Sequence, residues 1–547
     1  MKNAGESANR TLDLDRAPRE WFTSKVTPPI ASERLGSDLS KQQALNVLST
    51  DHLRDDLKGR SVRGGALSVV AQISQILLQT VSMVVLARLL MPSDFGLVAM
   101  VTGITAIAVG FADLGLTEAT IQRKEISHRQ VSTLFWINVG IGLLLTLLTA
   151  AAAPLLARFY REPKLVGITL VVSLSFLLGG LRSQHNALLK RQMRFSSIAI
   201  RDVTAYAVGV VVGVTMAWRG AGYWALVTYP LATSFAQLVI SWSMVKWMPG
   251  MPRLDAEVRS SIHFGGYVAA SYAVFNWLRN VDNVLIGWYW GASPLGLYSR
   301  AFNLLVLALS QITGPTSNVA IPAFSRIQGD PDLFSRYYLR IMNLIAWISA
   351  ALFGFLFVAA EPVIVLALGE KWRAAAPVFQ ILTLSALGQL LLESTLWLLI
   401  SRGQSARLFK LMLMMTPFII AGIAVGLPFG IKRVALSLSL TLLAIIPWVL
   451  KIAFRGTTLT FQGLGKALLC PVSLSLAGVC SARLATYFVP SEHTALQLLE
   501  TAVAFAIPYV LSIMISPVRK EMLSFWNLLG EFRLFRGRFA GKLKASA

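Results

Sequence analysis

The sequence predicts an all-α protein that crosses a membrane about 14 times. Of its 547 residues, 55% are hydrophobic and only 14% are charged, whereas a soluble protein carries about 25% charged residues. Uncharged runs such as residues 137–156 and 165–181 have the length of about 20 residues that a helix needs to cross a bilayer. A membrane barrel would instead show short segments of alternating hydrophobicity. These observations define a polytopic helical membrane protein.

Short loops separate the apolar runs, so they leave no room for an extramembrane catalytic domain. No GxxxxGK[ST] phosphate-binding motif occurs either.

Two spans contain a proline at which the helix is expected to weaken, Pro315 in the eighth and Pro417 in the eleventh. The predicted spans cover residues 65–90, 95–116, 132–156, 165–182, 196–217, 222–246, 262–289, 296–324, 338–360, 375–400, 406–430, 433–453, 466–487 and 495–516.

The sequence around the first loop reappears 200 residues later, which indicates an internal duplication. Ser93 and Gly96 align with Ser293 and Gly296, in each case where one apolar run ends and the next begins. Each copy would contain six spans, and an even number gives both copies the same orientation, the parallel repeat found in many transporters. The sequence therefore predicts two six-helix lobes and two additional C-terminal helices, at residues 64–250, 251–456 and 457–518.

Charge distribution predicts the orientation in the membrane. Lys and Arg concentrate in the loops that follow even-numbered spans, and loops of this kind face the cytoplasm. Both termini are therefore expected in the cytoplasm, and this bias explains the net charge of +23 without nucleic-acid binding. Residues 1–63 lack the apolar core of a secretory signal and are expected to be a disordered cytoplasmic region or a docking segment. Residues 519–547 are expected to form a basic, amphipathic cytoplasmic tail.

The seventh span contains the strongest cluster of polar residues. Asn276, Arg279, Asn280 and Asn283 follow a helical spacing that places them on one face, and Asp282 can pair with Arg279. Because polar groups in a span usually face a cavity or a partner, we interpret this face as the wall of a translocation cavity in which Arg279 meets an anion. The alternative is a buried pair that fixes helix packing.

Other polar residues add candidates for the cavity wall. Gln72, Gln75 and Gln79 form a stripe on the first span, where their amides would bind sugar hydroxyls or connect helices. Arg300, near the start of the eighth span, is expected to face the cavity or its periplasmic end. The sequence leaves these alternatives open.

Three isolated acids are candidates for coupling transport to an ion. Asp113 ends the second span, Glu393 lies in the tenth and Glu500 in the fourteenth. Each would bind a proton or cation, or would instead cap a helix, pair with a base or reach the membrane surface. No His/Cys spacing suits a metal and no catalytic constellation is recognisable, so neither a cofactor nor an enzymatic activity is expected.

The chain resembles lipid-linked polysaccharide flippases of the Wzx type, in the MOP exporter superfamily, over about residues 58–516. The resemblance implies two lobes whose spans 1, 2, 7 and 8 line a central cavity, and export of oligosaccharides attached to polyprenyl pyrophosphate. Cavity arginines would meet the pyrophosphate, a position that falls on Arg279 first and Arg300 second. The motifs that carry the resemblance are residues 63–68, 87–96, 111–116, 280–287 and 297–302.

The resemblance therefore implies a bacterial inner-membrane exporter of undecaprenyl-pyrophosphate-linked repeat units for exopolysaccharide, O-antigen or capsule. Coupling to H⁺ or Na⁺ rests on the resemblance alone, and polymerase or chain-length proteins are candidate partners. The alternatives are a multidrug cation antiporter, which needs a compact acidic site, and a membrane polymerase or ligase, which needs a large periplasmic loop. A peptidoglycan-precursor flippase is a further alternative.

Overall fold

The computed structural model describes residues 57–112, 115–123, 126–252, 279–488 and 493–514, and within these ranges every regular element is a helix. Twelve of the described helices are long and apolar enough to cross a membrane, or thirteen if one bent pair counts as a span. These findings confirm the predicted fold class. Most of the predicted seventh span, residues 262–289, lies within residues 253–278, which are outside the described residues, so the number 14 stays a prediction.

The first group of helices, here called the N-lobe, corresponds to the first six predicted spans. Its short helix α4 (Leu116–Gln122) lies at the end where α3 stops. The described helices that cross the lobe are α2 (Leu57–Leu89), α3 (Pro92–Phe111), α5 (His128–Tyr160), α6 (Leu165–Arg191), α7 (Phe195–Trp218) and α8 (Tyr223–Val245).

The local sequence explains how these helices begin and pack. At the start of α5, the Ser127 hydroxyl accepts from the amide of Gln130 while the Gln130 side chain accepts from the amide of Ser127, the reciprocal arrangement of a capping box. Further along, α5 and α6 approach closely because Gly142 and Gly180 have no side chain. A Cβ on Gly142 would lie 2.6 Å from the carbonyl oxygen of Phe176, which is the small-residue packing typical of membrane helices.

The second group, here called the C-lobe, contains the described helices α10 to α17. The short elements α13 (Ala360–Leu368), η3 (Glu370–Ala375) and η4 (Leu427–Phe429) lie at one end of it. The other described helices are α10 (Val281–Trp290), α11 (Ala292–Ile327), α12 (Pro331–Val358), α14 (Ala376–Leu384), α15 (Ala386–Ser401), α16 (Ser405–Gly426) and α17 (Ile431–Ala453).

Two details of the C-lobe differ from the predicted spans. The tenth span, predicted as one run over residues 375–400, is bent by 47° between Leu384 and Ala386. By contrast, α11 continues through Pro315 and α16 continues through Pro417. Proline removes one hydrogen bond but need not break a membrane helix, because neighbouring groups can satisfy the freed carbonyl.

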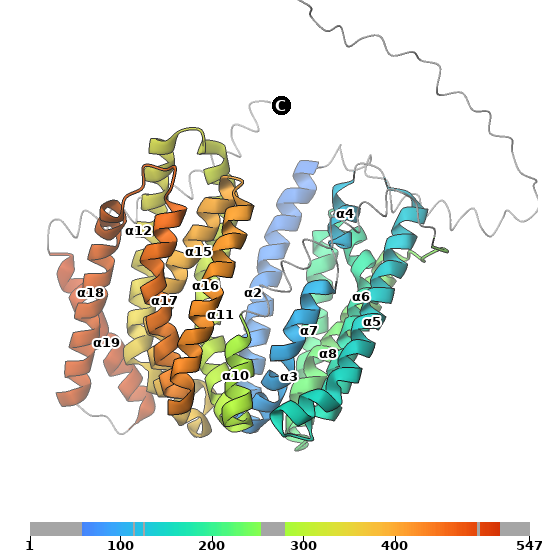
Figure 1. The fold of residues 1–547 in the computed structure, drawn as a ribbon, viewed down its shortest axis with the longest axis horizontal. Helices are drawn as coiled ribbons and strands as arrows, with labels where there is room; N and C mark the ends of the chain where they lie inside the picture. Colours follow the sequence, from blue (N-terminus) through green and yellow to red (C-terminus); the bar gives the residue numbers. More distant parts are fainter. Residues whose placement is uncertain (1–56, 113–114, 124–125, 253–278, 489–492, 515–547) are drawn as a thin grey trace, which may run out of the picture.

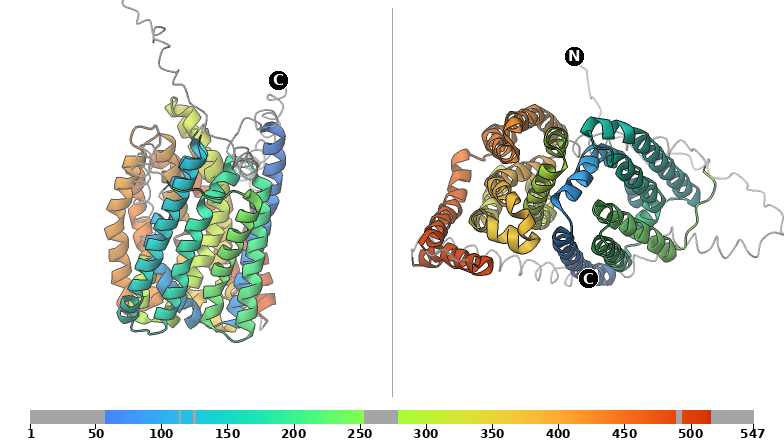
Figure 2. Two further views of the ribbon diagram at one scale, coloured as in Figure 1. Left: turned by 90° about the vertical axis from the view of Figure 1, so that its right-hand side faces the viewer. Right: turned by 90° about the horizontal axis from the view of Figure 1, so that it is seen from below.

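The two lobes stand side by side, and the pair α18 (Phe461–Phe488) and α19 (Thr494–Ser512) lies beyond the C-lobe, next to α12 (Figures 1 and 2). In Figure 1, α3 and α10 bring the lobes together at the lower end. The described loops in which Lys and Arg concentrate lie at the upper end. The lobes therefore meet at the end that the charge bias predicts to be periplasmic.

Candidate functional site

The contact between the lobes centres on a crossing of α3 with α11. A Cβ on Gly96 would overlap the backbone carbonyl of Ala292, and a Cβ on Gly296 would overlap that of Pro92. The contact is therefore reciprocal, and each of the four positions lies 200 residues from its counterpart. A twofold relation between the lobes would produce such a contact, so it supports the predicted repeat, which stays a prediction.

Polar groups from each lobe cap a helix of the other lobe beside this crossing. Arg88, in the last turn of α2, donates to two carbonyls in the last turn of α13. In return, Lys371 Nζ donates to the carbonyl of Arg88 at 2.9 Å, and Trp372 Nε1 donates to that of Ala87 at 2.8 Å. The last carbonyls of a helix lack partners within the helix and attract cations. These bonds therefore hold the closed end of the two lobes together.

We expect Trp372→Phe to weaken the closed contact, because it leaves the buried carbonyl of Ala87 without its donor, at a cost of about 1–3 kcal/mol. The measurement uses a background in which both native cysteines are replaced and Ala87→Cys is added. Maleimide should label this buried cysteine about tenfold faster when Trp372→Phe is also present. Trp290→Phe is the matched control, since Trp290 Nε1 donates to the carbonyl of Leu427 within the C-lobe. Equal labelling rates in the two variants would contradict a role for Trp372 in closure.

Some of the predicted cavity residues lie at this lobe contact. The Arg300 guanidinium carbon is 4.0 Å from the ring centroid of Phe95 on α3, and Arg300 Nε is buried with no hydrogen-bond partner in the described part of the chain. Asn283 and the backbone of Asn280 adjoin Gly103 of α3, and Asn283 Nδ2 donates to Asn280 Oδ1 at 3.4 Å. These three residues therefore face the N-lobe.

Within the described residues 279–283, the helical face predicted for the seventh span is interrupted. Arg279 and Asn280 form a turn, and α10 begins only at Val281. Asparagine and aspartate side chains compete with helical backbone bonds, and here the carboxylate of Asp282 accepts from the amide of Asn283. As a result Arg279 and Asp282 point into the C-lobe. The fourth member, Asn276, lies outside the described residues.

A cavity of about 400 Å³ lies inside the C-lobe, between α10, α11, α15, α16 and α17. Three charged side chains line it: Arg279 from the turn before α10, Asp282 from the first turn of α10 and Glu393 from α15. Arg279 is exposed and close enough to interact electrostatically with both carboxylates. The structure thus unites Glu393, a coupling candidate, with two residues predicted to bind substrate.

The cavity is amphipathic. At its charged end Asp282 is 4% exposed, and its carboxylate accepts from the Tyr298 hydroxyl at 3.0 Å and from the Asn283 amide at 2.8 Å. These bonds fix the carboxylate, because a buried charge is costly without hydrogen bonds. Much of the remaining lining is apolar and comes from α16 and α17, with Leu411, Met415, Ile419, Ile420, Leu438 and Leu442.

The remaining predicted residues lie elsewhere. Gln72 and Gln79 on α2 are exposed and Gln75 is half-buried. Glu500 is in α19, beyond the C-lobe and away from the charged cavity. Asp113 lies outside the described residues.

Sequence reasoning missed a charged network inside the N-lobe. Arg201 of α7 is buried, forms an ion pair with Asp202 at 2.8 Å and donates to Asn186 of α6 at 2.9 Å. Gln237 of α8 donates to Asp202 at 3.1 Å. The adjacent charges at residues 201 and 202, within a predicted span, were the available signal. Because these groups satisfy one another, the network joins α6, α7 and α8.

The two helical lobes that meet at one end define a two-lobed, all-helical membrane-protein fold. Two solved structures share it: the lipid II flippase MurJ in an inward closed conformation (TM-score 0.63, 14% identity, 82% of this chain and 99% of that chain), and an inward-facing multidrug resistance transporter of the MATE family in the MOP superfamily (TM-score 0.56, 14% identity, 70% and 96%).

Residues 85–377, more than half of the chain, match the profile of the family described as polysaccharide biosynthesis protein, and the chain belongs to that family. Among curated relatives, the lipopolysaccharide biosynthesis protein WzxC of Escherichia coli is 28% identical over 60% of this chain and 67% of the relative. The succinoglycan biosynthesis transport protein ExoT of Rhizobium meliloti is 26% identical over 58% and 64%. The teichuronic acid biosynthesis protein TuaB of Bacillus subtilis is 24% identical over 55% and 63%. The chain thus matches about two thirds of the length of these relatives.

Proposed function

We propose that this protein carries lipid-linked oligosaccharides across the bacterial inner membrane for the synthesis of a surface polysaccharide. The main support for the proposal is that the chain belongs to the polysaccharide biosynthesis family. Its two lobes also close against each other at one end. Names of relatives such as the succinoglycan biosynthesis transport protein support a transport role within polysaccharide biosynthesis. In alternating access, the closed contact opens while the other end closes.

The amphipathic cavity of the C-lobe suits a substrate that joins a charged head to a lipid. In this proposal Arg279 meets the pyrophosphate of an undecaprenyl-linked repeat unit, because a guanidinium can bind phosphate oxygens in a bidentate way. Arg300 at the lobe contact is the second candidate. Amides such as those of Gln72, Gln75 and Gln79 would bind sugar hydroxyls.

The two carboxylates beside Arg279 suggest how an ion gradient would act. Binding of H⁺ or Na⁺ to Asp282 or Glu393 would neutralise a negative charge next to the guanidinium and change its affinity for an anion. Asp113 and Glu500 stay as weaker candidates.

We place both termini in the cytoplasm from the Lys/Arg bias, so this conformation would be open to substrate from the cytoplasmic leaflet. Polymerase and chain-length proteins would act after export.

The proposal is tested by mass spectrometry of lipid-linked oligosaccharides from a deletion strain, combined with a membrane-impermeant probe of leaflet sidedness. We expect a complete repeat unit to accumulate on the cytoplasmic leaflet, and its mass would identify the sugar composition. Complementation with the intact chain should clear it. An unchanged lipid pool with new drug sensitivity would instead assign the protein to multidrug export, and a trapped unit on the outer leaflet would point to a polymerase or ligase.

A further inference from the structure

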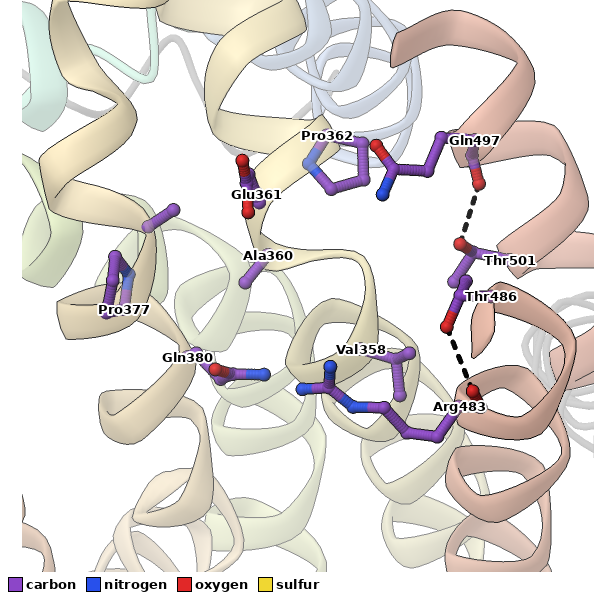
Figure 3. Close-up of a pocket in the computed structure, with 11 residues that line it drawn as sticks. Val358, Ala360, Glu361, Pro362, Pro377, Gln380, Arg483, Thr486, Gln497 and Thr501 are labelled. Atoms are coloured by element: carbon purple, nitrogen blue, oxygen red, sulfur yellow. Dashed lines mark hydrogen bonds between the residues drawn. The ribbon is translucent and has the colours of Figure 1, made fainter. Parts of the chain in front are cut away.

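A second cavity, of about 120 Å³, lies at the seam between the C-lobe and the helix pair α18–α19. Figure 3 shows Arg483 extending from α18 toward Gln380 of α14, with Glu361 of α13 and Gln497 of α19 on the other sides of the space. The pocket is thus lined by a guanidinium, a carboxylate and two carboxamides. It shares no lining residue with the C-lobe cavity.

The charged groups of this pocket are available to a ligand. Within the described part of the chain Arg483 is exposed and forms no ion pair, and its guanidinium carbon is 5.9 Å from the ring centroid of Phe357. The Glu361 carboxylate is 56% exposed and contacts Arg373 at 3.7 Å, a long ion pair that contributes little. Gln380 Nε2 donates to the carbonyl of Phe357 at 2.8 Å, which fixes this amide in the pocket wall.

The pocket lies where lipid headgroups are expected. Arg483 is five residues before the end of α18 at Phe488, which corresponds to about 7.5 Å along the helix axis. Tyr487 and Phe488 at that end are exposed, and tyrosine is enriched at the membrane surface. Leu484, next to Arg483, and Leu476, seven residues before it on the same helix, are each 58% exposed and suited to contact acyl chains.

We propose that this pocket binds the headgroup of a zwitterionic phospholipid, with the phosphate against Arg483 and the ammonium against Glu361. Guanidinium groups form charge-assisted, often bidentate, hydrogen bonds with phosphate oxygens, and the carboxylate across the pocket suits an ammonium group. The volume is well below the roughly 300 Å³ or more of sites for larger ligands, so an oligosaccharide does not fit. A lipid bound here would connect α18 and α19 to the C-lobe. This inference does not depend on the proposed function.

The test is native mass spectrometry of the purified full chain, titrated with dioctanoyl phosphatidylethanolamine, dioctanoyl phosphatidylglycerol or inorganic phosphate. We expect the intact protein to prefer phosphatidylethanolamine about tenfold, which corresponds to about 1.4 kcal/mol. Arg483→Gln should weaken binding of both lipids at least about tenfold. Glu361→Gln should remove the preference while retaining binding of both lipids. Arg219→Gln is the matched control, because Arg219 is an exposed arginine at the same end of the molecule.

Several results would overturn the proposal. Equal affinity of the intact protein for the two lipids would contradict the proposed contact between Glu361 and the ammonium group. Unchanged lipid binding by Arg483→Gln would contradict the contact between Arg483 and the phosphate. Displacement of lipid by an equal concentration of inorganic phosphate would assign the pocket to a free anion. If Arg483→Gln does not fold, Arg483→Lys, which keeps the charge but loses the bidentate geometry, should show an intermediate affinity, and wild-type affinity in that variant would contradict the proposed contact.

Discussion

Replacing Gly96 with alanine is expected to keep the two lobes apart at their closed end and to abolish export. The added Cβ would overlap the backbone carbonyl of Ala292, which cannot move away as a flexible side chain would. Overpacking costs about 1–3 kcal/mol where side chains can adjust. At the upper end of this range the closed state would lose about 100-fold in population. Gly296→Ala should have the same effect, because the contact is reciprocal.

Spin labels on the two lobes would measure this change. Arg219 of the N-lobe and Lys432 of the C-lobe are exposed at the closed end and can carry labels once the two native cysteines are replaced. We expect a longer distance between the labels in Gly96→Ala. Gly314→Ala is the control, since it changes a glycine of α11 at which an added Cβ meets no atom of the described chain within 4 Å. A wild-type distance together with wild-type export in Gly96→Ala would refute the role of this crossing.

Much of the fold could be predicted because membrane spans are encoded by local hydropathy. Each described span overlaps a predicted one, but the structure extends many of them. The third span, predicted over residues 132–156, is helical over His128–Tyr160. Hydropathy detects the apolar centre of a helix, whereas its ends are fixed by caps and by packing beyond the hydrocarbon. The capping box at Ser127 and Gln130 is such a local signal.

The irregularities of the helices could not be predicted as well. Pro315 suggested an interruption that α11 does not have, while the bend near Ser385 occurs without a proline at the bend. Such breaks depend on which neighbouring groups receive the freed backbone hydrogen bonds, and these groups come from other helices. A single sequence does not reveal them.

The candidate site was predicted as separate parts. The polar character of the seventh span was evident, but Glu393 could not be linked to Arg279 because it lies on α15, far along the chain. Arg279, Asn280 and Asn283 were also expected to lie on one face. The turn before α10 separates them, because Arg279 and Asp282 line the C-lobe cavity while Asn280 and Asn283 lie at the lobe contact. Tertiary packing, rather than helical periodicity, assembles this site.

Neutralising Arg279 is expected to produce the largest loss of transport among changes in the C-lobe cavity. A hydrogen bond to a charged group contributes about 1.5–3 kcal/mol, so Arg279→Gln should lower export of lipid-linked repeat units about 10- to 100-fold. The measurement is the amount of repeat unit trapped on the cytoplasmic leaflet in a complemented deletion strain. Arg433→Gln is the control, because Arg433 is an exposed arginine of the C-lobe that does not line the cavity.

A double variant separates substrate binding from simple charge balance. Removing Arg279 leaves Asp282 and Glu393 without its positive charge, and breaking a charge pair destabilises a protein even when the pair has no other role. Adding Glu393→Gln to Arg279→Gln relieves this imbalance, so the thermal midpoint of the purified double variant should return toward that of the wild type. If Arg279 meets the pyrophosphate, export stays low despite the recovered stability. If export recovers with stability, Arg279 serves only to balance the acids, and the anion must meet another residue, of which Arg300 is the first candidate.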